Sequence, residues 1–242
     1  MAKRIIVDED RCLSCKACVI ECALAHTSIG TMAKALEAGA ARLQPRMHVE
    51  PAGEFGMPVQ CRHCADAPCV AVCPKDALQR RSEDGPVLLD ESLCIGCGFC
   101  VLACPFGAID LSVAGKGVVK CDLCVERTDA GKLPACVSAC PTAALKYDEM
   151  EQPLESPLRE AGSDASTGAE ENEQRPDDGD TVCCVACGQA VGTRKKVAFV
   201  RKKLAGYVKV ADLCPRCRRI RFARSRARSL GAPATAGRTH RE

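Results

Sequence analysis

Short apolar runs separated by turn residues fill most of the first 147 residues, and none approaches the roughly 18 apolar residues of a membrane span. Residues 77–90, ALQRRSEDGPVLLD, predict a β-hairpin that turns at Asp84-Gly85. Residues 108–120, AIDLSVAGKGVVK, predict a second hairpin that turns near Gly115 and Gly117. This pattern indicates an α+β fold made of short hairpins and short helices.

Two further segments have patterns of their own. Residues 29–45, IGTMAKALEAGAARLQP, are rich in alanine and predict a helix from Thr31 until Pro45. We interpret it as a packing segment, with a helix that docks a partner as the alternative. Residues 195–210, KKVAFVRKKLAGYVKV, predict two short strands that turn near Gly206.

The distribution of charge divides the chain into three parts, although the net charge is only +3. Residues 1–147 carry 16 basic and 17 acidic side chains, residues 148–181 carry 2 and 12, and residues 182–242 carry 16 and 2. The middle part has no aromatic residue and is rich in Pro, Gly, Ser and Glu. It cannot bury enough apolar surface to fold, so residues 148–181 are predicted to be a disordered acidic linker.

The chain contains 21 cysteines in 242 residues, far more than a core of buried thiols requires. A disulfide scaffold expects a secreted chain with an apolar leader, whereas this chain opens MAKRIIVDEDRC. We therefore expect a cytoplasmic, reducing context in which the thiols bind metal.

Sixteen of the cysteines repeat in four groups of four. The first and third groups follow C-x2-C-x2-C-x3-C, and the second and fourth insert two and nine extra residues before the third thiol. Proline follows the last cysteine in every group but the first, where Ala23 stands. The groups are Cys12, Cys15, Cys18, Cys22; Cys61, Cys64, Cys69, Cys73; Cys94, Cys97, Cys100, Cys104; and Cys121, Cys124, Cys136, Cys140.

This spacing is typical of 4Fe-4S clusters. Three thiolates on one tight loop can bind three irons of a cube, while the fourth, turned away by proline, reaches a different cube. A single C-x2-C pair would favour a zinc knuckle, but zinc sites seldom use a third and a fourth thiol at these distances. Four consecutive groups therefore predict four 4Fe-4S clusters.

The motifs CRHCADAPCVAVCP, GPVLLDESLCIGCGFCVLACPFGAI and VVKCDLC with PACVSACPTAAL resemble the four-cluster, ferredoxin-like iron-sulfur subunits of dimethyl sulfoxide reductase, formate dehydrogenase and hydrogenase complexes. They look most like the electron-transfer subunit of carbon monoxide dehydrogenase. The resemblance covers residues 1–147 and implies a tandem bacterial-ferredoxin-like domain. It also implies that the groups exchange their last cysteines in pairs. Four ligand sets follow: Cys12, Cys15, Cys18 with Cys140; Cys121, Cys124, Cys136 with Cys22; Cys61, Cys64, Cys69 with Cys104; and Cys94, Cys97, Cys100 with Cys73.

The basic part begins with two further C-x2-C knuckles. Cys184, Cys187, Cys214 and Cys217 predict a small zinc-ribbon or rubredoxin-like domain over residues 182–220, which holds one zinc or one iron, with Cys183 spare or an alternative ligand. Residues 221–242 are predicted to be a basic, disordered tail. The segment RRIRFARSRARS is expected to dock a partner or to fold back on the linker and cluster domain, because it has too few aromatics to stack nucleic-acid bases.

The function predicted is electron transfer between a catalytic oxidoreductase subunit and a second carrier, with no catalysis by this chain itself. No G-x-G-x-x-G or P-loop is present. His26 and His63 are expected to be surface or supporting residues, and Lys116 and Lys120 solvated charges. The alternatives are a redox regulator that binds nucleic acid through its basic end, and a free polyferredoxin.

Overall fold

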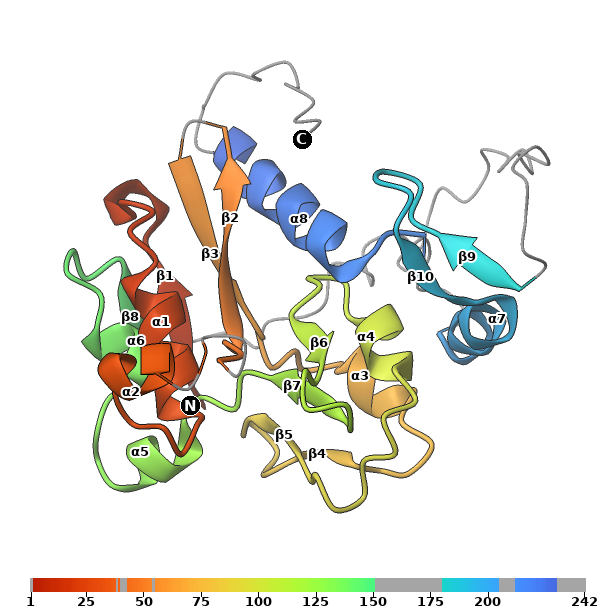
Figure 1. The fold of residues 1–242 in the computed structure, drawn as a ribbon, viewed down its shortest axis with the longest axis horizontal. Coiled ribbons are helices and arrows are strands. Elements are labelled where there is room, and N and C mark those ends of the chain that lie inside the picture. The colour runs from red at the N-terminus through yellow and green to blue at the C-terminus, as the bar shows by residue number, and fades with distance from the viewer. Residues whose placement is uncertain are drawn as a thin grey trace.

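The computed structural model describes residues 2–37, 39, 43–53, 55–150, 180–204 and 212–229. Within these ranges the chain is a mixed α+β structure of two-stranded antiparallel sheets and short helices, with no larger or closed sheet (Figure 1). The α+β prediction is thus confirmed. None of the described helices is long and apolar enough to span a bilayer.

In one half of the cluster domain, the first and the last strand of the domain pair with each other. Strand β1 (Ala2–Val7) pairs with β8 (Leu145–Met150), so that Ile5 lies opposite Tyr147. The short helix η1 (Glu9–Arg11), helix α1 (Ala17–Ala25), helix α5 (Val125–Asp129) and helix α6 (Ala135–Ser138) belong to this half. Its core joins aliphatic side chains to cysteines of the first and fourth groups.

The other half contains the two predicted hairpins, which are confirmed. Strand β4 (Leu78–Arg80) pairs with β5 (Val87–Leu89), and β6 (Ile109–Leu111) pairs with β7 (Val118–Lys120). Helices α3 (Pro68–Ala71) and α4 (Phe99–Ala103) pack against each other beside them. The second and third cysteine groups thereby share one core.

A third hairpin, which the sequence analysis did not predict, supports the C-terminal helix. Strand β2 (Met47–Ala52) pairs with β3 (Phe55–Gln60), and helix α8 (Pro215–Ser229) lies along this hairpin in Figure 1. Ala223 of α8 is fully buried against Ala52, Met57 and Val59. The predicted boundary at residue 220 falls inside α8, so the prediction of a disordered tail is wrong for residues 221–229; residues 230–242 lie outside the described ranges.

The segment between the two C-terminal knuckles is helical, so the predicted pair of strands is wrong there. After the hairpin of β9 (Thr181–Cys183) and β10 (Ala190–Thr193), the chain forms α7 (Arg194–Lys203). The Thr193 side chain accepts a hydrogen bond from the Lys196 backbone N–H and caps the helix. Val197, Val200 and Leu204 have helical spacing and are buried against α4. The predicted turn at Gly206 lies outside the described residues.

The alanine-rich segment forms a shorter helix than predicted. Helix α2 (Met32–Glu37) begins near the predicted start but ends well before Pro45. Gly39 follows with φ +80°, a conformation that terminates helices. Of the predicted linker, residues 151–179 lie outside the described part of the chain, while 148–150 belong to β8 and Thr181 to β9.

Candidate metal centres

The four cysteine groups share one loop conformation. The residue just before the second cysteine of each group has a left-handed backbone: Ser14 with φ 57°, His63 with 50°, Gly96 with 67° and Leu123 with 61°. A left-handed conformation costs a residue other than glycine of the order of 1–3 kcal/mol and persists only where the surroundings impose it. The sequence repeat is therefore also a structural repeat, and its strain is concentrated around the thiols.

The chain after the last cysteine repeats as well, but in three groups only. Asp76, Gly107 and Ala143 each stand three residues after the last cysteine and have φ between 50° and 63°. In each case proline follows the cysteine, and the preceding helix ends one or two residues before that cysteine. In the first group Ala23 replaces proline, and α1 continues through Cys22 to Ala25. The replacement of proline by Ala23 therefore lengthens α1, and the thiol of Cys22 stays buried.

Two cavities, each of about 340 Å³ including the space open to solvent, are lined by four cysteines. We call the first, with Cys73, Cys94, Cys97 and Cys100, the Cys73 site. The second, with Cys61, Cys64, Cys69 and Cys104, is the Cys104 site. Each combines three cysteines of one group with the last cysteine of the other.

For the remaining thiols, the resemblance implies two further sets, which we call the Cys140 site and the Cys22 site. The Cys140 site comprises Cys12, Cys15, Cys18 and Cys140; burial first, and then the charges of the other three thiols, raise the pKa of Cys18 to about 11. The Cys22 site comprises Cys22, Cys121, Cys124 and Cys136; burial, followed by Cys22 and Cys124, raises the pKa of Cys136. Burial and the thiols of Cys97, Cys94 and Cys73 likewise raise the pKa of Cys100 to about 12. Four thiolates can share such a space only when a cationic group holds them.

Backbone N–H groups approach the sulfurs at regular places. The backbone nitrogen of His63 lies 3.4 Å from Cys61 Sγ, and that of Leu123 lies 3.4 Å from Cys121 Sγ. In both loops the donor stands two residues after the cysteine. The Ala108 N–H lies 3.3 Å from Cys104 Sγ. Donors of this kind stabilise thiolates and raise the reduction potential of a bound cluster.

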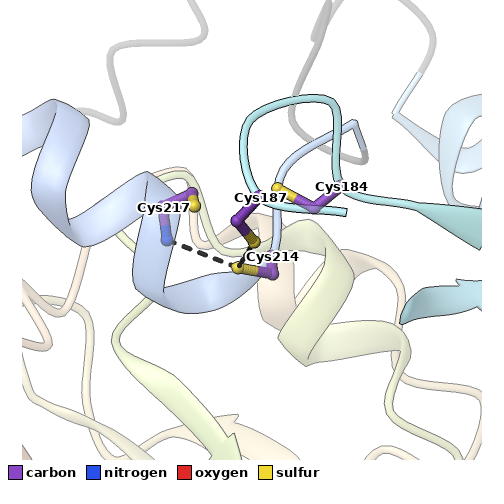
Figure 2. Close-up of side chains that lie close together, drawn as sticks. All are labelled: Cys184, Cys187, Cys214 and Cys217. Carbon is purple, nitrogen blue, oxygen red and sulfur yellow. Dashed lines mark hydrogen bonds between the residues drawn. The ribbon is translucent and has the colours of Figure 1, made fainter. Parts of the chain in front are cut away.

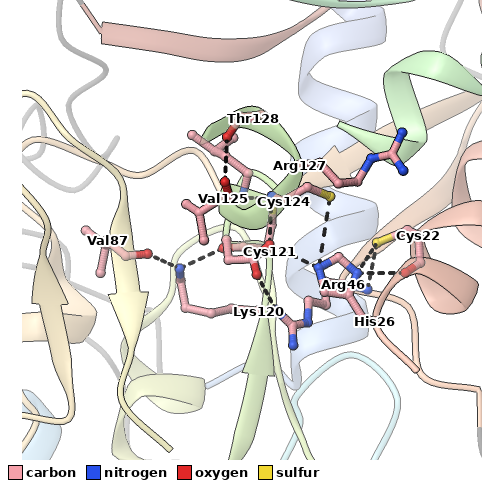
Figure 3. Close-up of polar contacts among 12 residues, drawn as sticks. Cys22, His26, Arg46, Val87, Lys120, Cys121, Cys124, Val125, Arg127 and Thr128 are labelled. Atoms are coloured by element: carbon pink, nitrogen blue, oxygen red, sulfur yellow. Dashed lines mark hydrogen bonds and ion pairs between the residues drawn. The ribbon is translucent and has the colours of Figure 1, made fainter. Parts of the chain in front are cut away.

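His26 belongs to a polar network beside the Cys22 site, as Figure 3 shows in part. Its Nε2 pairs with Asp122 Oδ1 at 3.1 Å, and Arg46 Nη1 pairs with Asp122 Oδ2 at 2.6 Å. Burial opposes protonation of His26, but hydrogen bonds to Asp122, Cys124 and Cys22 outweigh it and raise its pKa to about 12. His26 is therefore a supporting residue, as expected; Arg46 and Asp122 were missed, although Asp122 stands between two cysteines.

Lys120 contradicts the expectation of a solvated charge, whereas Lys116 is exposed as expected. Lys120 is 3% exposed, and its ammonium donates to the carbonyls of Val87 and Cys121 (Figure 3). His63 is 2% exposed, and its Nδ1 accepts from the Val87 N–H at 3.0 Å. Both are buried between the halves of the domain, which spacing alone did not indicate.

The four C-terminal cysteines converge on one point (Figure 2). The Sγ atoms of Cys184, Cys187, Cys214 and Cys217 all lie within 4.8 Å of one another, and those of Cys187 and Cys214 are 3.7 Å apart. Four sulfurs tetrahedrally bound to zinc at about 2.3 Å stand about 3.8 Å apart. Burial raises the pKa of Cys184, but backbone N–H groups led by that of Cys214 outweigh it and lower the pKa to about 6. This donor set, which we call the C-terminal site, fits one tetrahedral zinc or iron ion.

Two arginines attach the C-terminal site to the cluster domain. Arg218 follows Cys217 directly and donates to the carbonyls of Leu102 and Cys104. Arg219 Nε pairs with Glu50 at 2.7 Å, and its Nη1 donates to the Gly107 carbonyl at 2.8 Å. The hypothesis that the basic segment folds back on the cluster domain is thus confirmed. The acceptors are remote in sequence, so no local pattern singled out these two arginines.

The twenty-one cysteines are all free thiols, which agrees with metal binding and not with a disulfide scaffold. The donor sets around the two cavities consist of sulfur alone, the preference of iron-sulfur clusters. The residues present therefore fit 4Fe-4S groups by donor chemistry and by the gathering of four thiols around each cavity.

Comparison with known proteins supports this assignment. Residues 54–150 match the family described as a 4Fe-4S dicluster domain. An iron-sulfur protein of Rhodospirillum rubrum is 42% identical over 159 residues, which cover 61% of this chain and 82% of that protein. The putative electron transport protein YsaA of Escherichia coli is 37% identical over 66% of this chain and 98% of its own. The thiosulfate reductase electron transfer subunit PhsB of Salmonella typhi is 38% identical over 60% and 74%.

The first of these relatives is covered over four fifths of its length, and the family match over residues 54–150 contains the second, third and fourth cysteine groups. The chain belongs to the family of ferredoxin-like 4Fe-4S proteins, which includes electron-transfer subunits of reductases.

Proposed function

We propose that this chain holds four 4Fe-4S clusters and relays single electrons between a catalytic oxidoreductase subunit and another carrier. The sixteen ligands are the cysteines of the Cys140, Cys22, Cys104 and Cys73 sites. The observation that supports the proposal best is the mixed composition of the two cavities, each of which takes its fourth thiol from the other group. Such exchange places two clusters close together, as a relay requires.

Each cluster, when bound, accepts and returns one electron. The chain's own residues bind the cluster through thiolates, exclude water with short apolar side chains and supply backbone N–H groups to the sulfurs. Only Cys15 among the sixteen ligands is exposed, in the Cys140 site. Ile95, beside Cys94 of the Cys73 site, is 60% exposed. These two sites are thus the places where electrons would enter and leave.

The test is anaerobic purification of the chain from its own cells, with analysis of iron, sulfide and co-purifying proteins. We expect about sixteen irons per chain in clusters and a stoichiometric catalytic subunit with its own metal. Cys100→Ala should remove one cluster and leave three, whereas Lys116→Ala, at an exposed position, should keep four. A count of two clusters, or recovery without a catalytic subunit, would contradict the relay.

We further propose that the C-terminal site holds a single structural zinc ion, with rubredoxin-type iron as the alternative. The convergence of four thiols supports it. Metal analysis of Cys187→Ala against Cys183→Ala tests this, because Cys183 is exposed and is not among the four. Cys187→Ala should lose one equivalent of zinc and keep the cluster iron; Cys183→Ala should lose neither.

The regulatory alternative, in which the basic end binds nucleic acid, receives less support. Arg218 and Arg219 are buried against the cluster domain, and Arg226 pairs with Glu9 at 2.7 Å. These arginines contact the chain itself in place of a partner. Phosphate contacts would have to come from other basic residues, with binding that falls steeply with salt.

A further inference from the structure

Two buried N–H groups, one lining the Cys104 site and one beside it, have no acceptor among the described residues. His63 lines its cavity, and His63 Nε2 is buried without a hydrogen-bond partner. Since Nδ1 accepts from the Val87 N–H, the ring is neutral and its single proton resides on Nε2. A buried donor without an acceptor costs about 1–3 kcal/mol. An acceptor is therefore expected in the cavity.

The second such group belongs to α8. Arg218 is 3% exposed; its Nε donates to the Leu213 carbonyl and its Nη1 to those of Leu102 and Cys104. Its Nη2 is buried and has no partner. Nη1 reaches the carbonyl of a Cys104-site cysteine, so the guanidinium lies directly beside that site. A charged N–H in such a place is an especially strong donor to sulfur.

Positive charge also gathers around this site. Arg62 lines the cavity with its guanidinium 5.7 Å from the Phe106 ring centroid and 5.5 Å from that of Phe222. The Lys120 ammonium donates to the carbonyl of Val87, another lining residue. One acid, Asp66, stands in the same loop and works against these cations.

The neighbouring Cys73 site has a different environment. Its lining is mostly apolar, and its only basic residue is the exposed Lys75. None of the unpartnered buried atoms among the described residues lines that cavity. The two sites are alike in thiols and in volume, so their difference lies in charge and in N–H donors.

We propose that the cluster of the Cys104 site is more readily reduced than the cluster of the neighbouring Cys73 site, because His63 and Arg218 donate hydrogen bonds to its sulfurs. Reduction adds negative charge to the cluster, and donors and nearby cations stabilise the reduced form more than the oxidised form. Of these two clusters, an electron then resides on that of the Cys104 site. His63 and Arg218 are positioning residues that set its potential, and the inference rests on the proposed ligand sets.

The experiment is a redox titration of the anaerobically purified full chain, with the reduced clusters observed by electron paramagnetic resonance. The signal lost in Cys64→Ala identifies the Cys104-site cluster. In the wild-type protein that signal should have a higher midpoint potential than the Cys73-site signal, which Cys100→Ala removes. His63→Phe and Arg218→Gln should each lower its reduction equilibrium constant about tenfold, which is about 59 mV for one electron.

Controls separate the donor effect from general damage. Arg221→Gln removes the same charge from an exposed position of α8 and should leave the potential unchanged. His63→Gln, which can still accept from Val87 and donate an N–H, should restore most of the shift. The inference is overturned if the Cys104-site signal does not have the higher potential of the two, or if His63→Phe shifts the Cys73-site signal equally. If Cys64→Ala removes no signal, the ligand assignment itself fails, which is a different result.

Discussion

Removal of the Arg219 guanidinium should release α8 from the cluster domain. The Arg219 side chain is 9% exposed and pairs with Glu50, whose side chain is 10% exposed. Breaking a buried pair by removing one partner costs about 3–5 kcal/mol, because the other charge is left uncompensated. Arg219 also contacts Asp110, which is 26% exposed and still has His48 at 2.8 Å, so we take the lower end, about 3 kcal/mol. At 1.4 kcal/mol per factor of ten, α8 would open about a hundredfold more often.

Hydrogen exchange of the α8 amides, measured by mass spectrometry on the anaerobic cluster-loaded protein, reports this opening. Arg219→Met should speed exchange over residues 219–229 about a hundredfold. The control Arg221→Met removes an exposed charge from the same helix, and surface substitutions change stability by about 0.5 kcal/mol or less. Adding Glu50→Leu to Arg219→Met should recover part of the loss, because no unpaired charge then remains buried at that contact. Exchange in Arg219→Met equal to that of the control would refute the reasoning.

Three further predictions concern the same interface and the core beneath it. A Cβ at Gly107 would lie 2.1 Å from the Pro215 carbonyl oxygen, so Gly107→Ala should speed α8 exchange, while Gly115→Ala, with a positive φ but open space, should not. Burial raises the pKa of Asp110, but the His48 hydrogen bond and the Arg219 charge outweigh it and hold the pKa below the ordinary value of about 3.9. The stability that ionised Asp110 gives is therefore full above about pH 4 and lost as pH falls through the lower folded-state pKa, so α8 exchange, corrected for intrinsic rates, should rise only in acid. Asp110→Asn should show faster exchange at pH 7 and no such acid response. Lys120→Met should lower the free energy of unfolding by about 1–3 kcal/mol, because two buried carbonyls lose their donor; an unchanged melting temperature would contradict this.

Local patterns predicted the features that neighbouring residues decide. The Asp84-Gly85 hairpin is present because its turn residues and short apolar strands agree. In all four groups the first two cysteines have the same spacing, and the residue before the second cysteine has the same left-handed backbone conformation. The segment after Thr193 was misassigned because valines and phenylalanine favour strands, whereas burial of Val197 and Val200 against α4 selects the helix.

The sequence by itself determined which residues are the candidate metal ligands: thiol spacing is a local property, and it identified sixteen cysteines in four groups and four more near the C-terminus. Only the tertiary structure decided which buried charges surround each group. Lys120, Arg218 and Arg219 look like ordinary basic residues in the sequence, yet each is buried on acceptors from distant segments. A buried cation is stable only where folding brings carbonyls or carboxylates to it, and no short stretch of sequence contains that information.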